Sequence, residues 1–270
     1  MTEVRHWAQL RSDEIAAMVA EADRWFVLQP IGAIEQHGDH LPVDVDVHCA
    51  QGVCEGVAAR VERVVVAPPI WWGFSPGQTF KAGTLTLRSE TLLHLLRDVV
   101  GSIYATGFRH AMIVNGHNGN KWMAGQAVSE ISRPAGTTLS AVTYFDLAVD
   151  AFTEHRVSPI GGEGHAGELE TAMELLLRPE LVRDERVVRY VESITDYGMR
   201  DLAVRGPLLA IAGPRPMREV YPDGVMGDPS GATAELGRHL FDAAVDAIGE
   251  VIADVRADLA STTTTNDEGA

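Results

Sequence analysis

The feature that most constrains the fold of this chain is a regular alternation of short apolar runs, rich in β-branched residues, with segments of helical pattern. Alternation at this spacing is typical of parallel βαβ units, whose sheet carries helices on both faces. We therefore predict an α/β fold of three layers, in which a mainly parallel central sheet is flanked by helices. Strands are expected at 25–32, 61–70, 110–116, 137–145 and 207–213, and helices at 47–60, 89–104, 168–177 and up to residue 131.

Length and apolar content indicate one domain. The chain has 270 residues, of which 46% are apolar, and this suffices for a single continuous core. We predict that residues 1–260 form one domain. The last ten residues, STTTTNDEGA, show no apolar periodicity, so a disordered tail is expected over 261–270.

The charge balance excludes some classes of partner. Against 22 Lys and Arg stand 38 Asp and Glu, a formal net charge of −16. Such a field repels phosphate backbones and anionic membrane surfaces, so we expect no nucleic-acid partner and no membrane partner. No apolar run approaches the roughly 20 residues that span a bilayer, and no basic segment leads into an apolar signal sequence. The sequence predicts a soluble, cytoplasmic protein.

The chain has two cysteines, Cys49 and Cys54, both inside one expected helix. Residues five apart on a helix lie on different faces, so a disulfide between them is excluded by geometry. Reduced thiols agree with the cytoplasmic prediction.

The stretch from Gly32 to Asp46, GAIEQHGDHLPVDVD, directly follows an apolar strand and is rich in carboxylates and imidazoles. Charges beside a core cost free energy unless water, opposite charge or a metal ion compensates them. Enzyme metal sites are commonly built from His, Asp and Glu of several loops. The stretch offers six such side chains: Glu35, His37, Asp39, His40, Asp44 and Asp46.

Further candidates come from distant parts of the chain. Glu35 and His37 are two apart, so in an extended segment they point to the same side, and Asp46 can return there after the turn at LPVD. NGHNGN, residues 115–120, also follows a strand, and ligands of parallel sheets collect at the carboxyl ends of strands. His117 should therefore lie close to the first cluster. GGEGHAGELETAMEL adds His165 and Glu170. Two ions held in this way can acidify one water and polarise a carbonyl.

Simpler interpretations exist for several of these residues. In one alternative, the segment with Glu35, His37 and Asp46 only caps the helix that follows. NGHNGN taken alone is a turn that contains a histidine. Asp39 and His40 either orient a ligand or lie in a solvated loop, and Asp44 is expected to be structural. Other side chains receive a structural interpretation: Glu163, Glu168 and Glu174 as solvated or capping carboxylates, with Glu168 a possible partner of the site, and Trp71 and Trp72 as core or subunit contacts.

Together, these clusters resemble the creatininase (creatinine amidohydrolase) family. The resemblance rests on GAIEQHGDHLPVDVD, on GTLTL at 83–87, on NGHNGN and on HAGELETA at 165–172, and it extends in order over about residues 30–177. It implies a creatininase-like α/β fold and a homohexamer. It also implies a centre of two divalent ions, Zn, Mn or Fe, that acts on cyclic or linear amide C–N bonds.

The resemblance also implies a ligand set. Glu35, Asp46 and His117 match the ligands of one ion, and His37 and Asp46 match those of the other, with Asp46 as the bridge. Creatinine hydrolases carry a glutamate two residues after the NGH histidine, where this chain has Gly119. We propose Glu170 as the replacement ligand. His165 matches the histidine that passes a proton to the leaving nitrogen, assisted by Glu170 or Glu168.

The expected substrate pocket departs from that of creatinine hydrolases. Phe145 and Gly161 stand where those enzymes have tryptophans, and Lys81 and Ala82 lie in a loop that replaces their His-x-x-Phe-Pro-Gly-Thr sequence. Lys81 would favour a substrate with a carboxylate or phosphate, so selectivity for creatinine is not expected. The candidate substrate contacts are Ser75, Gln78, Lys81, Asn118, Phe145 and His165.

The resulting prediction is a metal-dependent amidohydrolase that cleaves a cyclic or linear amide of a small molecule with a water activated by two ions. Two alternatives lie within the same chemistry: a deformylase of a formylamino-pyrimidine ribonucleotide, and a peptidase that trims a ribosomally made cofactor precursor. A third alternative is a non-catalytic metal-binding scaffold. The presence of both His165 and Glu170 disfavours the scaffold, because proton-transfer residues have no use there.

Overall fold

The computed structural model describes residues 3–131, 134, 136–185, 188 and 216–267, with only the backbone described beyond residue 258. Five strands form one sheet in the order β1-β3-β2-β4-β5, and all neighbouring strands are parallel. They are β1 (Arg5–His6), β2 (Phe26–Ile31), β3 (Val64–Val66), β4 (His110–Asn115) and β5 (Thr138–Thr143). This confirms the predicted α/β class. The strand predicted at 207–213 lies outside the described residues.

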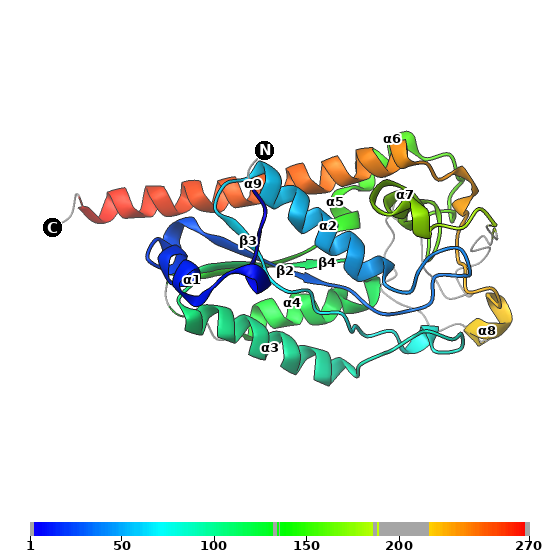
Figure 1. Ribbon diagram of the computed structural model, residues 1–270, viewed down its shortest axis with the longest axis horizontal. Coiled ribbons are helices and arrows are strands. Elements are labelled where there is room, and N and C mark those ends of the chain that lie inside the picture. The colour runs from blue at the N-terminus through cyan, green and yellow to red at the C-terminus, as the bar shows by residue number, and fades with distance from the viewer. Residues whose placement is uncertain (1–2, 132–133, 135, 186–187, 189–215, 268–270) are drawn as a thin grey trace.

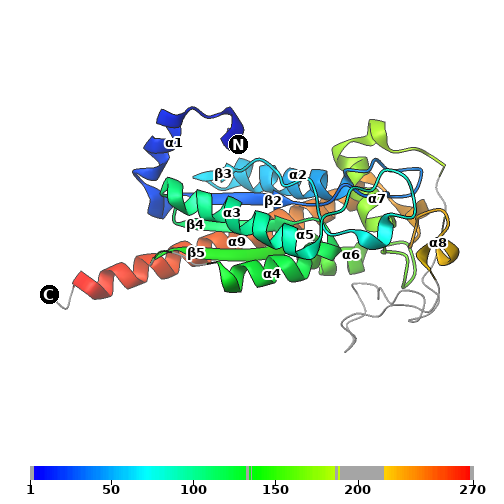
Figure 2. The same cartoon turned by 90° about the horizontal axis from the view of Figure 1, so that it is seen from below.

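Helices cover both faces of the sheet (Figures 1 and 2). Helices α2 (Val45–Arg60), α5 (Tyr144–Leu147), α6 (Val149–His155), α7 (Glu168–Leu177) and α9 (Ala234–Asp267) contribute to one apolar cluster. Helices α1 (Ser12–Val19), α3 (Ser89–Thr106) and α4 (Lys121–Glu130) contribute to the other. The short helix α8 (Met217–Val220) belongs to a third, small cluster.

The strands divide their side chains between the two clusters. Phe26 and Leu28 of β2 pack under α2, whereas Val27 and Ile31 face α3 and α4. Successive side chains of a strand point to opposite faces, so a strand covered on both sides is mainly apolar. All six residues of β2 and all six of β4 are buried accordingly.

Element boundaries follow local chemistry. Helix α3 continues to Thr106 and ends at Gly107, whose φ of +118° is the left-handed conformation that terminates helices. Strand β3 covers only three residues of the expected 61–70, because the strand stops short of Pro68 and Pro69, which lack the N–H needed for sheet pairing.

The C-terminal end differs from the prediction. Helix α9 continues to Asp267, through most of the segment 261–270 for which we expected disorder. No glycine or proline interrupts residues 250–267, so no residue type that breaks helices stands in its way. Its N-terminal part packs on α2, α6 and α7, and its C-terminal part extends beyond the sheet (Figure 1). Within the described part of the chain, no helix combines the length and apolarity needed to cross a membrane.

The sheet register aligns the strand ends that matter for the site. Ile31 at the end of β2 lies opposite Asn115 at the end of β4, and Asn115 lies opposite Thr143 at the end of β5. The loops that follow β2 and β4 therefore leave the sheet at the same level.

Candidate metal centre

Two glycines let the strand ends approach the helix that carries Asp46. A Cβ atom on Gly32, just after β2, would lie 2.2 Å from the backbone nitrogen of Val47, and one on Gly116, just after β4, would lie 2.0 Å from the backbone oxygen of Asp46. No side chain fits at either position. The first turn of α2 therefore rests directly on both strand ends.

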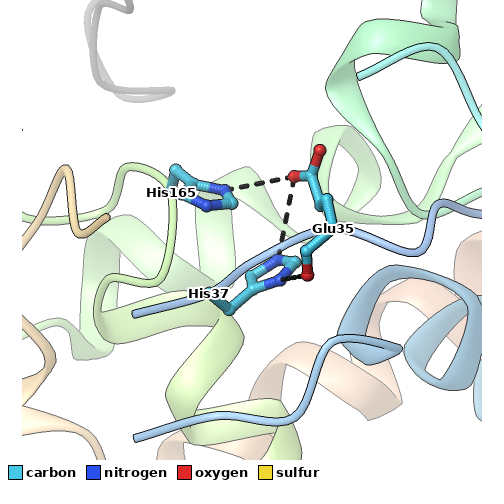
Figure 3. A group of neighbouring side chains, drawn as sticks. All are labelled: Glu35, His37 and His165. Carbon is cyan, nitrogen blue, oxygen red and sulfur yellow. Dashed lines mark hydrogen bonds and ion pairs between the residues drawn. The ribbon is translucent and has the colours of Figure 1, made fainter. Parts of the chain in front are cut away.

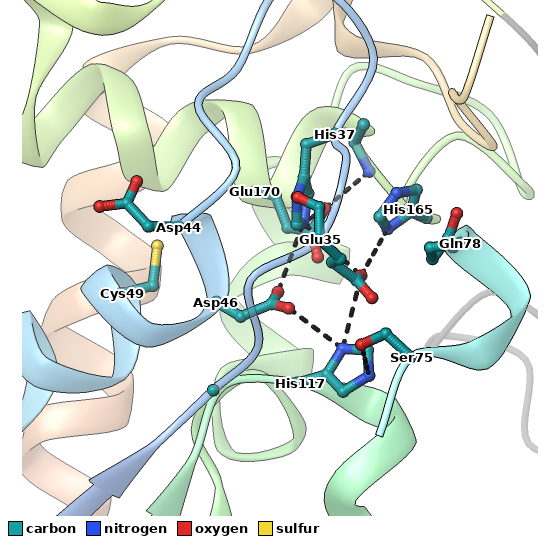
Figure 4. A network of polar contacts seen from close by, with 12 residues as sticks. Glu35, His37, Asp44, Asp46, Cys49, Ser75, Gln78, His117, His165 and Glu170 are labelled. Atoms are coloured by element: carbon teal, nitrogen blue, oxygen red, sulfur yellow. Dashed lines mark hydrogen bonds and ion pairs between the residues drawn. The ribbon is translucent and has the colours of Figure 1, made fainter. Parts of the chain in front are cut away.

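Asp46 lies at the centre of a buried cluster of titratable side chains (Figure 4). Its Oδ1 is 3.3 Å from Nε2 of His37, and its Oδ2 is 3.1 Å from Nδ1 of His117. His117 Nδ1 is also 3.5 Å from Oε1 of Glu35. The three segments that the sequence predicted to meet at this edge of the sheet, 32–46, 115–120 and 165–172, do meet there.

Two more predicted residues complete the cluster. His165 Nδ1 lies 3.3 Å from Oε1 of Glu35, and its ring centroid is 4.4 Å from that of His37 (Figure 3). Glu170 Oε2 lies 3.5 Å from His37 Nε2. Glu170 is on the first turn of α7, and its Oε2 also accepts a hydrogen bond from the backbone N–H of Ala166 at 2.6 Å.

The donor atoms fall into sets of the kind that bind metal ions. Three sets have all ligand atoms within 4.8 Å of one another: Glu35 with Asp46 and His117, His37 with Asp46 and Glu170, and Glu35 with His37 and His165. The first two sets share Asp46. Glu35 Oε2, His37 Nε2 and Asp46 Oδ2 are fully buried and face their neighbours without a hydrogen bond of good geometry. Buried polar atoms are normally satisfied, so these atoms fit a cation ligand.

Without a cation, protonated imidazoles compensate the negative charge of the buried carboxylates. Burial lowers the pKa of His117, but the charges of Glu35 and Asp46 outweigh burial and raise that pKa to about 9. For His37, burial is likewise outweighed by Glu170 and Asp46, and the pKa lies well above its usual value. Burial raises the pKa of Asp46, yet the two imidazoles bring it far below its usual value. A divalent cation would supply the same compensation as the imidazole protons.

His165 differs from the other two histidines. Burial and the neighbouring charge of His37 lower its pKa below the usual value. A neutral imidazole can accept a proton, which a permanently charged one cannot. The residue is thus electrostatically suited to proton transfer beside the cluster.

The side chain of Gln36 has a fixed orientation above His165. Its Oε1 accepts from the backbone N–H of Gly38 at 3.0 Å. Its Nε2 donates to the carbonyl of Gly224 at 3.0 Å and to Oε1 of Gln78 at 2.6 Å. An amide NH2 group has two hydrogens, and both are used by these acceptors.

This arrangement selects the tautomer of His165. Its Nε2 lies 2.6 Å from the backbone oxygen of Gln36 and 3.1 Å from the Gln36 Nε2, which has no hydrogen left to donate. Nε2 must therefore carry the proton and donate to the Gln36 carbonyl. In the neutral ring, Nδ1 keeps its lone pair and faces Glu35 and the metal-binding cluster.

Gly119 has no room for the side chain that creatinine hydrolases carry there. A Cβ atom on Gly119 would lie 2.3 Å from Nε2 of His117 and 2.3 Å from the carbonyl oxygen of Phe74. The packing leaves the ligand position at Gly119 without a side chain. Besides Asp46 and Glu35, Glu170 is a further carboxylate within reach of His37, at 3.5 Å.

Of the predicted substrate contacts, some lie beside the metal-binding cluster and others do not. The Ser75 hydroxyl lies 3.1 Å from His117 Nε2, so Ser75 can orient that ring. Gln78 contacts Gln36, as described above. Lys81 forms an ion pair of 3.0 Å with Asp39, and Asn118 is exposed. Phe145 is buried in the apolar cluster beneath α2 and α9, so the structure assigns it to the core.

The interpretation of Glu168 and Glu174 as solvated or capping carboxylates was wrong, because both are fully buried. Glu168 accepts hydrogen bonds from the backbone N–H groups of Val157 and Ser158 at 2.8 and 2.9 Å, so it fixes that loop rather than assisting His165. Trp71 and Trp72 are 41% and 48% exposed and do not belong to the core.

Sequence reasoning missed two groups of residues around the centre. Gln36 stands between two ligands in the sequence, but its partners Gly224 and Gln78 are far away in the chain. The expected structural role of Asp44 is confirmed by a pair of hydrogen bonds from Arg178, a residue not singled out from the sequence. The spacing of Glu174 and Arg178, four residues apart on a helix, was the available signal.

The chain is similar to proteins of one known family, in sequence and in structure. The family model for creatininase, described as creatinine amidohydrolase, matches residues 8–252. The chain is 35% identical to the mycofactocin precursor peptide peptidase of Mycobacterium tuberculosis, over 82% of this chain and 81% of that protein. It is 31% identical to creatinine amidohydrolase of Pseudomonas putida, over 67% and 74%. A crystal structure of creatinine amidohydrolase superimposes with a TM-score of 0.78 at 26% identity, over 94% and 98%.

Proposed function

The chain belongs to the creatininase family of amidohydrolases, and on that premise we propose that it hydrolyses an amide C–N bond with two divalent metal ions. Five side chains would hold the ions: Glu35, His37, Asp46, His117 and Glu170. Carboxylates and imidazoles suit Zn, Mn and Fe. When bound, two such ions activate water and polarise a carbonyl oxygen.

One observation carries the proposal: two ligand sets share Asp46, and three of their atoms are buried without a hydrogen bond of good geometry. Two of these atoms, His37 Nε2 and Asp46 Oδ2, make ion-pair contacts of 3.1–3.5 Å within the cluster, whereas a purely structural cluster is expected to join them by hydrogen bonds of good geometry. The alternative that Asp46 serves only as a helix cap finds no support, since α2 begins at Val45 and the carboxylate of Asp46 contacts His37 and His117.

The remaining chemistry falls to His165. Its Nδ1 faces the cluster with a free lone pair in the neutral ring, while its Nε2–H is held by the Gln36 carbonyl. In the proposed reaction, Nδ1 accepts a proton from the attacking water and returns it to the departing nitrogen. Glu170 assists this proton transfer only through its negative charge. Its carboxylate contacts His37 and the backbone N–H of Ala166 rather than the ring of His165.

Activity with and without metal tests this function. We would measure formation of the carboxylate product from a panel of small cyclic and linear amides, with protein stripped by a chelator and reloaded with Zn²⁺ or Mn²⁺. The proposal expects activity that returns with metal and falls in His165→Ala by about 10²-fold or more. His239→Ala changes an exposed histidine of α9 that stacks on His155, and it serves as the control. Equal activity in stripped and reloaded protein would contradict the proposal.

A precursor-peptide peptidase is the second candidate for the substrate. The relative from M. tuberculosis is described as such an enzyme, and in this chain Gly161 stands where a tryptophan of creatinine hydrolases is expected, which favours a larger amide. Assays with short peptides cleaved at an internal amide separate this candidate from small cyclic amides. The deformylase candidate depended on Lys81 as a contact for the substrate phosphate. Because Lys81 forms an ion pair with Asp39, this support is lost.

A homohexamer in the cytoplasm completes the proposal. The exposed large apolar side chains include Trp71, Trp72, Leu85 and Trp122, which are 41–58% exposed. Their segments adjoin one another, since Leu87 N–H bonds to the Gly73 carbonyl and Phe74 N–H bonds to the Asn120 side chain. An exposed apolar group of this kind supports subunit contact, and the two unpaired cysteines support the compartment. Light scattering coupled to gel filtration measures the assembly, and a monomeric mass would contradict it.

A further inference from the structure

Helix α7 presents a row of three charged residues toward the start of α2. Glu170, Glu174 and Arg178 follow one another at intervals of four, so they lie along one face of the helix. Glu170 stands at the metal-binding cluster. Glu174, one turn further, is fully buried, and Arg178 lies at the C-terminal end.

Arg178 joins this row to the loop that precedes α2. Its two terminal nitrogens donate to both oxygens of Asp44, at 2.9 and 2.8 Å, and its Nε donates to Glu174 at 3.0 Å. Arginine is the side chain that can hold a carboxylate through two parallel bonds and a second carboxylate at the same time. We call Asp44, Glu174 and Arg178 the clamp.

The clamp accounts for an unusual feature of α2. Asp44 is the N-cap residue of that helix, but its side chain makes no capping hydrogen bond. An aspartate at this position normally accepts from the first turn, with a gain in stability. Here the carboxylate is turned to Arg178 instead, which ties the start of α2 to α7.

The clamp bridges the elements that supply one of the two metal sites. His37 and Asp46 come from the loop and the first turn next to Asp44, and Glu170 comes from α7. The other site, Glu35 with Asp46 and His117, is built on the ends of β2 and β4, where Gly32 and Gly116 hold the first turn of α2 without help from α7. Loss of the clamp should therefore change the position of Glu170 relative to His37 more than any distance in the first site.

We propose that Arg178, acting through Asp44 and Glu174, is a positioning residue that fixes Glu170 beside His37 and Asp46 and so sets the affinity of one metal site selectively. The inference rests on the proposed binuclear function. The two ions would then have different structural supports. The strand ends support the first site, Glu35 with Asp46 and His117, and the clamp between α2 and α7 supports the second, His37 with Asp46 and Glu170.

Zn²⁺ titration of metal-free protein tests this assignment. The stoichiometry and the two affinities would be measured by calorimetry against a competing chelator, in wild type and in Arg178→Met. We expect the second affinity to fall by about tenfold or more, with the first unchanged. Arg178→Lys keeps the charge but loses the paired bonds, so its second affinity should lie between those of wild type and Arg178→Met.

A matched control is available at the other end of α2. Arg60 also pairs with two carboxylates, Asp242 and Asp246, but at the exposed far end of α2. Arg60→Met should leave both affinities unchanged. Far-ultraviolet circular dichroism verifies the fold of each variant. In Arg178→Met, the buried Glu174 keeps its contacts with His48 and Cys49 but loses those with Arg178. Where that variant fails to fold, Asp44→Asn and the double variant Glu174→Gln/Arg178→Met make the same test.

The outcomes separate this inference from the proposed function. Two ions in wild type with both affinities retained in Arg178→Met, or an equal fall in both affinities, would overturn the clamp assignment alone. Fewer than two ions in wild type would overturn the binuclear function, and the clamp assignment with it.

Discussion

The Nε2 atom of His117 occupies the space that a side chain on Gly119 would need, since a Cβ there would lie 2.3 Å from it. Gly119 is thus required by the orientation of a metal ligand. A glutamate at position 119, as in creatinine hydrolases, would collide with His117. In this chain, the carboxylate of Glu170 lies beside His37 instead.

Gly119→Ala should displace the His117 ring and lower metal affinity by about tenfold or more, as expected when a ligand loses its orientation. Gly125→Ala is the control, because nothing lies within 4 Å of a Cβ at that position in α4. The control should keep its metal affinity and gain about 0.5–1 kcal/mol of stability from the helix propensity of alanine. Both are measured by Zn²⁺ titration and urea unfolding. Unchanged affinity in Gly119→Ala would contradict the packing argument.

Gln36→Met should impair catalysis without loss of metal. Methionine has a similar size but cannot bond to Gly38, Gly224 or Gln78, so the ring of His165 loses the support above it. We expect kcat to fall by about 10–100-fold, with KM and metal content close to wild type. Gln51→Met, which removes a hydrogen bond to Glu55 within α2, is the matched variant. A rise in KM with unchanged kcat would assign Gln36 to substrate binding instead.

Glu168→Ala should destabilise the protein and spare the chemistry. The substitution leaves the backbone donors of Val157 and Ser158 without their acceptor, and an unsatisfied buried donor costs about 1–3 kcal/mol. Urea unfolding measures this loss against Glu154→Ala, an exposed carboxylate on α6. Activity per folded molecule should stay near wild type. A large loss of kcat in stable protein would restore the role beside His165 that the sequence suggested.

Both cysteines should resist thiol reagents in the native protein. Cys49 and Cys54 are fully buried and unpaired, and burial raises the pKa of each thiol well above its usual value. The reactive thiolate is therefore absent at neutral pH, and raising the pH to about 9 should not expose it. A colorimetric thiol assay should count none in native protein and both after denaturation. Rapid labelling of native protein would contradict the described burial.

Local sequence patterns predicted the positions of the ligands that lie at or just after the ends of strands. The Glu35–His37 alternation and the position of His117 directly after a strand follow from periodicity and parallel topology, and both were found at the same edge of the sheet. Helix α7 has the predicted bounds. The metal centre was therefore predictable because its ligands occur in short motifs at strand ends.

Other features depend on packing between distant segments. Glu168 and Glu174 look like solvated residues of an amphipathic helix. Their burial is stabilised by contacts of Glu168 with Ser158 and of Glu174 with Arg178 and His48. Phe145 was assigned to a pocket by alignment with the family, although its apolar neighbours place it in the core. Long-range contacts of this kind leave no local signal in one sequence.

The central claim is that Asp46 is shared by two metal ions, and elemental analysis of metal per subunit tests it most directly. Protein purified without chelator should contain about two divalent ions. Asp46→Ala should lose both, and Glu170→Ala should lose one, because Glu170 belongs to one ligand set and Asp46 to two. Zero or one ion in wild type, with the same content in both variants, would contradict the account of the centre.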